Sequence, residues 1–120
     1  MLNLDTHILL FALTDDLTRR ERALLSNETW SISAIVLWEI AKLSELGRIE
    51  IDLDHPELTR TLARIQTWPV TLEVCRTIQT LDFDSDPADE IIAATSIVHR
   101  VPLMPRDRKL RRSKLVPIAA

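Results

Sequence analysis

Short apolar segments alternate with helical segments along the whole chain, and this alternation restricts the fold more than any other feature. We expect strands over residues 1–5, 29–32, 68–72, 101–105 and 115–119, and an extended segment over 49–54. We expect helices over 6–13, 17–26, 34–46, 56–67, 73–81 and 88–100, and a turn or short helix over 106–112. This pattern is typical of an α/β fold in which helices cover both faces of a mainly parallel sheet. Because parallel strands end at one edge, we expect any functional site at that edge.

The composition narrows the classes of function. The 120 residues suit one domain, and the net charge of −3 does not indicate general nucleic-acid binding, although six of the fifteen Lys and Arg residues lie in 106–114. A single cysteine, Cys75, excludes an internal disulfide and a thiolate metal cage. A single glycine, Gly47, excludes a glycine-rich phosphate-binding loop.

The sequence also suggests where the protein acts. The apolar N-terminus contains Asp5 and no basic leader, so we expect no signal peptide. No apolar run reaches the length that spans a bilayer. We therefore expect a cytoplasmic protein without a membrane partner.

Four acidic residues have positions that suggest a joint role. Asp5 ends the first strand, Asp107 follows the strand over 101–105, and Asp89 lies in the first turn of the helix over 88–100. Glu39 lies within an apolar helix, where a lone buried carboxylate costs several kcal/mol or takes up a proton unless it is paired. We expect the four carboxylates to meet at the active edge of the sheet.

Each acid also has a plain structural explanation. Asp5 suits a helix N-cap, and Glu39 can reach solvent or pair with Lys42 or Arg48. Asp107 can pair with one of the basic residues beside it. These alternatives stay open for each residue taken alone.

The acidic stretch "DFDSDPADE" (residues 82–90) divides into parts with different roles. Asp86 and Pro87 fit the N-cap and the first helical position, and Asp89 follows one turn into the helix. Asp82 and Asp84 are expected to be solvated loop residues. Within this stretch, Asp89 is the residue that we expect to bind a metal.

A cluster of carboxylates predicts a cation. Carboxylates about 4 Å apart repel one another by roughly 4 kcal/mol per pair, so the cluster must take up protons or hold a positive ion. Since the ligands are oxygen atoms, the expected ion is Mg²⁺ or Mn²⁺. Such a metal keeps bound water and suits phosphodiester hydrolysis.

Four blocks of the sequence carry a resemblance to a known family: "LDTHILLFAL", "ISAIVLWEIAKLSELGRIEI", "DPADEIIAAT" and "PLMPRDRKLRRSKLVPI". In this order they resemble the PIN-domain ribonucleases, specifically the VapC-type toxins of toxin–antitoxin pairs. The resemblance implies a single PIN domain over residues 1–120, with a three-layer α/β/α fold and a central, mainly parallel sheet. It also implies an Mg²⁺- or Mn²⁺-dependent endoribonuclease.

The resemblance assigns roles to individual residues. The family's acidic quartet falls on Asp5, Glu39, Asp89 and Asp107, as catalytic residues and metal ligands. Asp86 corresponds to a frequent additional acid, and Thr6 to a hydroxyl residue that supports the site. The family further implies a homodimer and a cognate antitoxin, whose C-terminal segment lies across the groove and blocks it.

Two positions depart from the family pattern. Met104 and Pro105 stand where a hydroxyl residue usually precedes the last acid, which puts the positioning of water or phosphate in doubt. Glu90 stands where arginine is common, which puts a pairing near the site in doubt. Basic residues that follow the last strand, Arg106, Arg108 and Lys109, are candidates for RNA phosphate contacts.

Two other functions remain possible from the sequence. A PIN-like module that binds RNA or a partner without catalysis would fit the departure at Met104 and Pro105. A phosphoacceptor receiver domain that binds Mg²⁺ is a more remote reading, because Asp5 stands alone after the first strand. Tryptophan residues such as Trp38 are expected in the core or an interface.

Overall fold

Four parallel strands form the central sheet in a computed structural model that describes residues 1–106 and 108–119. The strands are β1 (Leu2–Leu4), β2 (Trp30–Ser33), β3 (Gln66–Trp68) and β4 (Leu103–Met104), in the spatial order β3-β2-β1-β4. In the register, Asn3 lies opposite both Ser31 and Leu103. The predicted α/β fold with a parallel sheet is confirmed.

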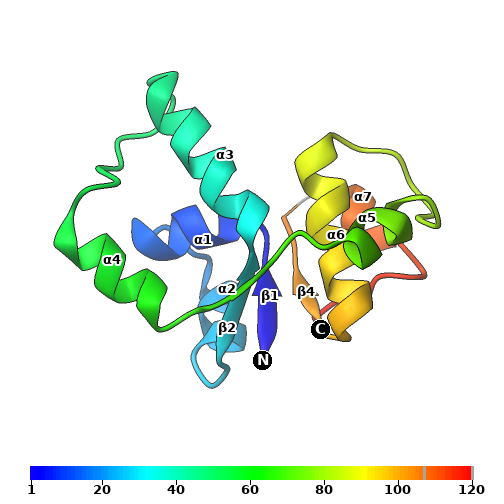
Figure 1. Ribbon diagram of the computed structural model, residues 1–120. Coiled ribbons are helices and arrows are strands. Elements are labelled where there is room, and N and C mark those ends of the chain that lie inside the picture. The colour runs from blue at the N-terminus through cyan, green and yellow to red at the C-terminus, as the bar shows by residue number, and fades with distance from the viewer. Residues whose placement is uncertain (107, 120) are drawn as a thin grey trace.

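Two groups of helices flank the strands. The helices are α1 (Thr6–Leu13), α2 (Arg19–Leu25), α3 (Ala34–Glu45), α4 (Pro56–Ala63), α5 (Leu72–Ile78), α6 (Pro87–His99) and α7 (Arg108–Arg112). Figure 1 shows α1, α3 and α4 to the left of the strands and α5, α6 and α7 to the right. Among the helices described, none combines the length and the hydropathy that crossing a membrane requires.

The central strand β1 is buried on both faces, as expected for a parallel sheet covered by helices. Leu4 is fully buried, and so is the polar residue before it, Asn3. The side-chain amide of Asn3 donates to the Ser96 hydroxyl at 2.9 Å and to the Ile92 carbonyl at 3.4 Å, and both acceptors are on α6. These bonds satisfy a buried polar group and fix α6 against β1. The end of β1 and the start of α6 therefore have defined relative positions.

Two of the predicted strands differ from the structure. The strand predicted over 68–72 is wrong: β3 ends at Trp68, Pro69 follows, and α5 already begins at Leu72. The Thr71 hydroxyl caps α5 by accepting from the Val74 amide at 3.2 Å, which favours helix over strand there. Of the strand predicted over 115–119, only one parallel bridge between Ile118 and Leu103 is present.

Candidate active site

Asp5 lies where β1 ends and α1 begins, and it is 4% exposed. Its Oδ1 accepts from the Ile8 amide at 2.8 Å, which makes Asp5 the N-cap of α1. Its Oδ2 accepts from the Arg106 amide at 2.7 Å. Burial raises the pKa of the Asp5 carboxyl, while the two amides act in the opposite direction. The structure thus holds both oxygens of one buried carboxylate in place.

Glu39 faces Asp5 from the middle of α3 and is partly buried. The Thr6 hydroxyl donates to Glu39 Oε1, so the predicted supporting residue contacts one of the predicted acids. Burial raises the pKa of the Glu39 carboxyl, and the negative charges of Asp86 and Asp5 add to that rise. The suggested pairing with Lys42 is not what the structure shows, since Lys42 pairs with Glu45 at 3.5 Å.

Asp86 and Asp89 lie at the start of α6. Asp86 Oδ1 accepts from the Asp89 amide at 3.0 Å, which confirms the predicted N-cap. Asp89 Oδ2 accepts from the Ser85 hydroxyl at 2.9 Å. Glu90, which replaces the common arginine, accepts from the Ser85 amide at 3.4 Å and so braces the loop before α6.

Four of these acids line one cleft of about 370 Å³: Asp5, Glu39, Asp86 and Asp89, together with His7, Phe11 and Arg106. The acids come from β1, α3 and the start of α6, as the carboxyl-edge rule predicts. The fourth predicted ligand, Asp107, lies outside the described residues. Over residues 1–106 and 108–119, no three His, Cys, Asp or Glu side chains form a ready-made metal-binding group. The cleft acids nevertheless offer only oxygen donors, which fits a hard cation.

The contacts of Arg106 were not predicted from the sequence. Its guanidinium forms a bidentate ion pair with Glu21, with Nε–Oε2 and Nη2–Oε1 both at 2.6 Å. The same group lies over the Phe11 ring, 4.2 Å from its centroid. A local signal for Glu21 was present: it completes a capping box with Thr18 at the start of α2.

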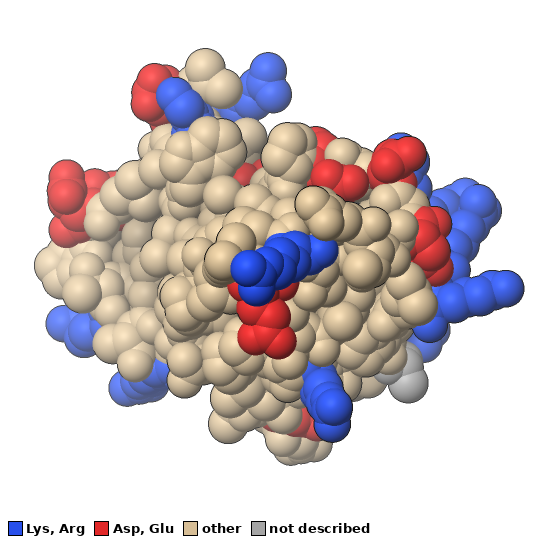
Figure 2. Space-filling model, turned by 45° about the vertical axis from the view of Figure 1, so that its right-hand side comes forward, with Lys and Arg blue, Asp and Glu red and all other residues tan. Residues whose placement is uncertain are grey.

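The other charged candidates that the structure describes are not among the residues that line the cleft. Asp82 is an exposed loop residue, as predicted, and it also accepts from the Ser113 hydroxyl at 2.6 Å and the Lys114 amide at 2.8 Å. The bond from Ser113 is the main cause of the lowered pKa of Asp82. Arg108 and Lys109 are exposed on α7. Figure 2 shows acidic side chains along the upper part of one face and basic side chains projecting at its right edge.

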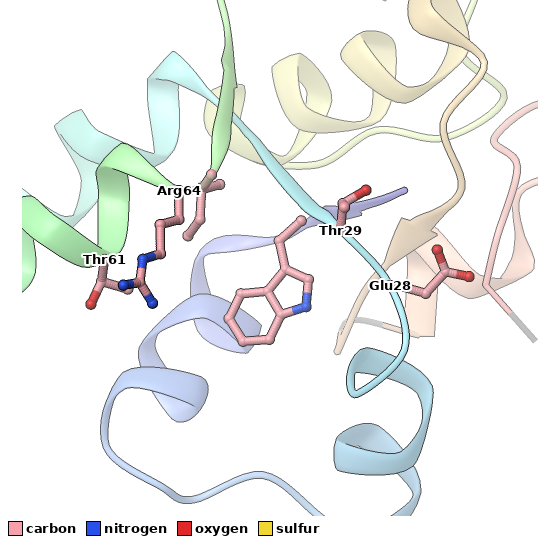
Figure 3. A pocket seen from close by; sticks show the side chains of 6 residues that line it. Glu28, Thr29, Thr61 and Arg64 are labelled. Atoms are coloured by element: carbon pink, nitrogen blue, oxygen red, sulfur yellow. The ribbon is translucent and has the colours of Figure 1, made fainter.

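Two further hollows lie outside the acidic cleft. One, of about 410 Å³, adjoins the cleft because it shares His7 and Phe11, and its remaining walls are mainly apolar: Leu10, Thr14, Leu43, Arg48, Ile49 and Ile51. The other, of about 270 Å³, shares no lining residue with the cleft. In Figure 3, Thr61 and Arg64 lie at the end of α4, and Glu28 and Thr29 belong to the segment before β2. It therefore lies at the amino edge of the sheet, away from the acidic cleft.

Comparison with known proteins decides the family. The sequence model of one protein family, the PIN domain, matches residues 3–114. The chain belongs to the PIN-domain family. Its 112 matched positions include all four predicted acids, and the resemblance stated from the sequence blocks is confirmed.

The relatives of this PIN domain agree with that assignment. The chain is 36% identical to Ribonuclease VapC22 of Mycobacterium tuberculosis over 84 residues, which are 68% of this chain and 65% of that protein. Two solved structures share the fold: VapBC2 from Rickettsia felis bound to a promoter DNA fragment, and a toxin–antitoxin complex from Klebsiella pneumoniae. The first has a TM-score of 0.73 at 18% identity and covers 98% of this chain and 97% of that one. The second has a TM-score of 0.69 at 18% identity and covers 93% and 91%.

The raised pKa of Glu39 yields a test of the cleft's electrostatics. We predict that Glu39→Gln raises the Tm of metal-free protein at pH 7 by about 2–5 °C, because it removes a disfavoured charge. The pKa of Glu39 in the folded protein lies above its ordinary value of 4.5. Below pH 4.5 the carboxyl is protonated in both the folded and the unfolded protein, so it does not affect stability. Above the folded-state pKa the carboxyl is ionised in both, and its charge destabilises the fold. The Tm difference should therefore widen as the pH rises through the folded-state pKa. Thermal unfolding in EDTA between pH 4 and 8 measures it.

The matched control is Glu45→Gln, which removes an exposed carboxylate from the end of the same helix. This control should change the Tm little at any pH. Equal effects of the two variants would contradict a special charge environment at Glu39.

Proposed function

We propose that this PIN domain is an Mg²⁺- or Mn²⁺-dependent endoribonuclease that hydrolyses RNA phosphodiester bonds, with Asp5, Glu39, Asp89 and Asp107 as catalytic residues and metal ligands. The observation that carries the proposal is the cleft itself. Three of the four acids line it from separate elements of a PIN domain, and burial raises the pKa of two of them. Carboxylates in such surroundings are stabilised by a cation.

The chain's own residues prepare the site. The amides of Ile8 and Arg106 hold the Asp5 carboxylate, and the Thr6 hydroxyl orients Glu39. Ser85 holds one oxygen of Asp89. When bound, Mg²⁺ or Mn²⁺ would lower the pKa of a coordinated water and stabilise negative charge on the phosphoryl oxygens. Asp86 supports the site from the helix N-cap.

RNA phosphates are proposed to contact exposed basic residues on α7. Arg108 and Lys109 on α7 are exposed and immediately follow Asp107 in sequence. Arg106 was grouped with them from the sequence, but Glu21 and Phe11 engage its guanidinium. We assign the phosphate contacts to Arg108 and Lys109 because both residues are exposed. Binding through such contacts weakens as salt rises.

Cleavage of RNA by the purified protein tests the activity. We predict cleavage with Mg²⁺ or Mn²⁺, none in EDTA, and a loss of at least about a hundredfold in Asp5→Asn and in Asp89→Asn, because each removes a charged ligand. Asp84→Asn is the matched control, an exposed acid from the same acidic stretch, and it should cleave normally.

Two results separate the alternatives. Undiminished cleavage by both Asp5→Asn and Asp89→Asn would rule out the proposed site. Metal binding by calorimetry without any turnover would favour a PIN-like module that binds RNA or a partner without catalysis. The observation that favours this second function is that Met104 and Pro105 replace the usual hydroxyl residue, and both are buried.

We further propose that the nuclease is a toxin with a cognate antitoxin. The named structural relatives are toxin–antitoxin complexes, and the mainly apolar hollow beside the cleft offers a binding surface for a protein segment. A segment that lies across the acidic cleft and the adjoining apolar hollow would cover His7 and Phe11. It would exclude RNA from the acids of the cleft. The proposed substrate implies action in the cytoplasm.

Growth of an expressing host tests the toxin assignment. We predict that expression arrests growth, and that Asp5→Asn relieves the arrest because it removes a metal ligand. Co-expression of a small upstream reading frame that encodes a DNA-binding antitoxin should also restore growth. Normal growth at a verified level of soluble, active protein would contradict a toxin role.

A homodimer is the proposed state of the free protein. Leu37 and Trp38 are neighbours on α3 and are 38% and 56% exposed, so Trp38 is not a core residue. Adjacent exposed apolar side chains favour an interface, and aromatic residues are enriched at such surfaces.

Light scattering after gel filtration tests the interface. We predict that the wild-type protein is a dimer, and that Trp38→Glu shifts it to a monomer because a charge at the buried centre is costly. Leu72→Glu is the control, since Leu72 is 65% exposed on α5. A dimer that survives Trp38→Glu and dissociates in Leu72→Glu would move the interface to α5.

A further inference from the structure

We propose that Glu21 is a positioning residue for the acidic site: it holds the Arg106 guanidinium and thereby keeps the Arg106 amide on the Asp5 carboxylate. Glu21 lies on α2, outside the set of residues that line the cleft. The expected effect of Glu21 on catalysis rests on the proposed nuclease function. Its expected effect on the hydrogen bond between the Arg106 amide and Asp5 does not.

The contacts form a continuous path from α2 to Asp5. Both carboxylate oxygens of Glu21 accept from Arg106, at 2.6 Å each, across 85 residues of sequence. The backbone amide of the same arginine donates to Asp5 Oδ2 at 2.7 Å, across 101 residues. One residue therefore connects a helix that carries no cleft acid to the most buried acid of the site.

The arginine is held from more than one side. Phe11 lies 4.2 Å from the guanidinium carbon, so the planar group is packed against an aromatic face and paired along its edge. A bidentate pair fixes orientation as well as distance. Rotation of the Arg106 side chain away from Glu21 would break two charge-assisted hydrogen bonds together, so the backbone at this position has little freedom.

The other end of the path is rigid as well. The Glu21 side chain is 7% exposed, and its Oε1 also accepts from the Thr18 amide at 2.9 Å. The Thr18 hydroxyl in turn accepts from the Glu21 amide at 3.1 Å. This capping box fixes Glu21 to the first turn of α2. Capping alone would use one oxygen of Glu21, whereas the arginine takes both.

Two rival explanations give different results. If Arg106 binds RNA phosphate, removing the charge of Glu21 frees the guanidinium, and the KM for RNA should fall. If the ion pair only stabilises the fold, Glu21→Gln should lower the Tm and leave the kcat of the folded protein unchanged. Positioning predicts a lower kcat with little change in KM.

Amide hydrogen exchange followed by NMR tests the structural consequence without any need for activity. In Glu21→Gln we expect the Arg106 amide to exchange at least about tenfold faster, because its bond to Asp5 opens more often. Exchange of the Asn3 backbone amide, which donates to the Pro102 carbonyl at 2.8 Å, should be unchanged. The matched control is Asp15→Asn, which removes the exposed pair with Arg22 on the same helix. Unchanged Arg106 exchange, or equal acceleration at Asn3, would overturn the proposal.

Kinetics test the catalytic consequence. With saturating Mn²⁺, below the Tm of each variant, we expect Glu21→Gln and Arg106→Lys each to lower kcat by about tenfold or more. The double variant should be no worse than either single one, since both remove the same contact. A fall in KM, or a normal kcat in Glu21→Gln, would overturn the catalytic part. If the wild-type protein does not cleave RNA, the proposed nuclease function is refuted. The hydrogen-exchange experiment then still decides whether Glu21 holds the Arg106 amide on Asp5.

Discussion

The buried carboxylate of Asp5 accepts hydrogen bonds from two backbone amides, and the arrangement of the whole sheet edge depends on these bonds. The Ile8 amide lies in the first turn of α1, and the Arg106 amide belongs to the segment after β4. One side chain thus joins a strand, a helix start and a second strand end. Each oxygen uses one of its lone pairs in these bonds, so each retains capacity for another partner. A single residue can therefore serve as both helix cap and metal ligand.

The acids of the cleft oppose the stability of the fold that holds them. Burial raises the pKa of Asp5 and Glu39, and the charge of Asp86 adds to the effect on Glu39. The backbone amides and the Thr6 hydroxyl offset part of this cost. These donors hold the carboxylates of Asp5 and Glu39 in fixed positions, although the negative charges of the two groups repel each other. A cation bound between the carboxylates would offset this repulsion and favour their charged forms.

The sequence predicted contacts that depend on neighbouring residues better than contacts across the chain. Asp86 and Pro87 were placed correctly because N-cap preferences act within one turn. The strand predicted over 68–72 failed because Thr71 caps a helix there, a choice that periodicity in a short segment cannot reveal. The pair of Glu21 with Arg106 was missed for another reason. Nothing in either local sequence indicates which residues 85 positions away will be neighbours.

The departure at Met104 and Pro105 has a limited consequence for the geometry of Asp5. The Met104 side chain is 2% exposed and belongs to the core, and the Pro105 carbonyl accepts from Arg111 at 3.0 Å. Neither residue supplies a side-chain hydroxyl, so a hydroxyl contact to water or phosphate is not available there. The Asp5 carboxylate, however, is held by the backbone amides of Ile8 and Arg106, which do not involve the side chains at 104 and 105. The departure therefore leaves the hydrogen bonds that hold Asp5 unchanged.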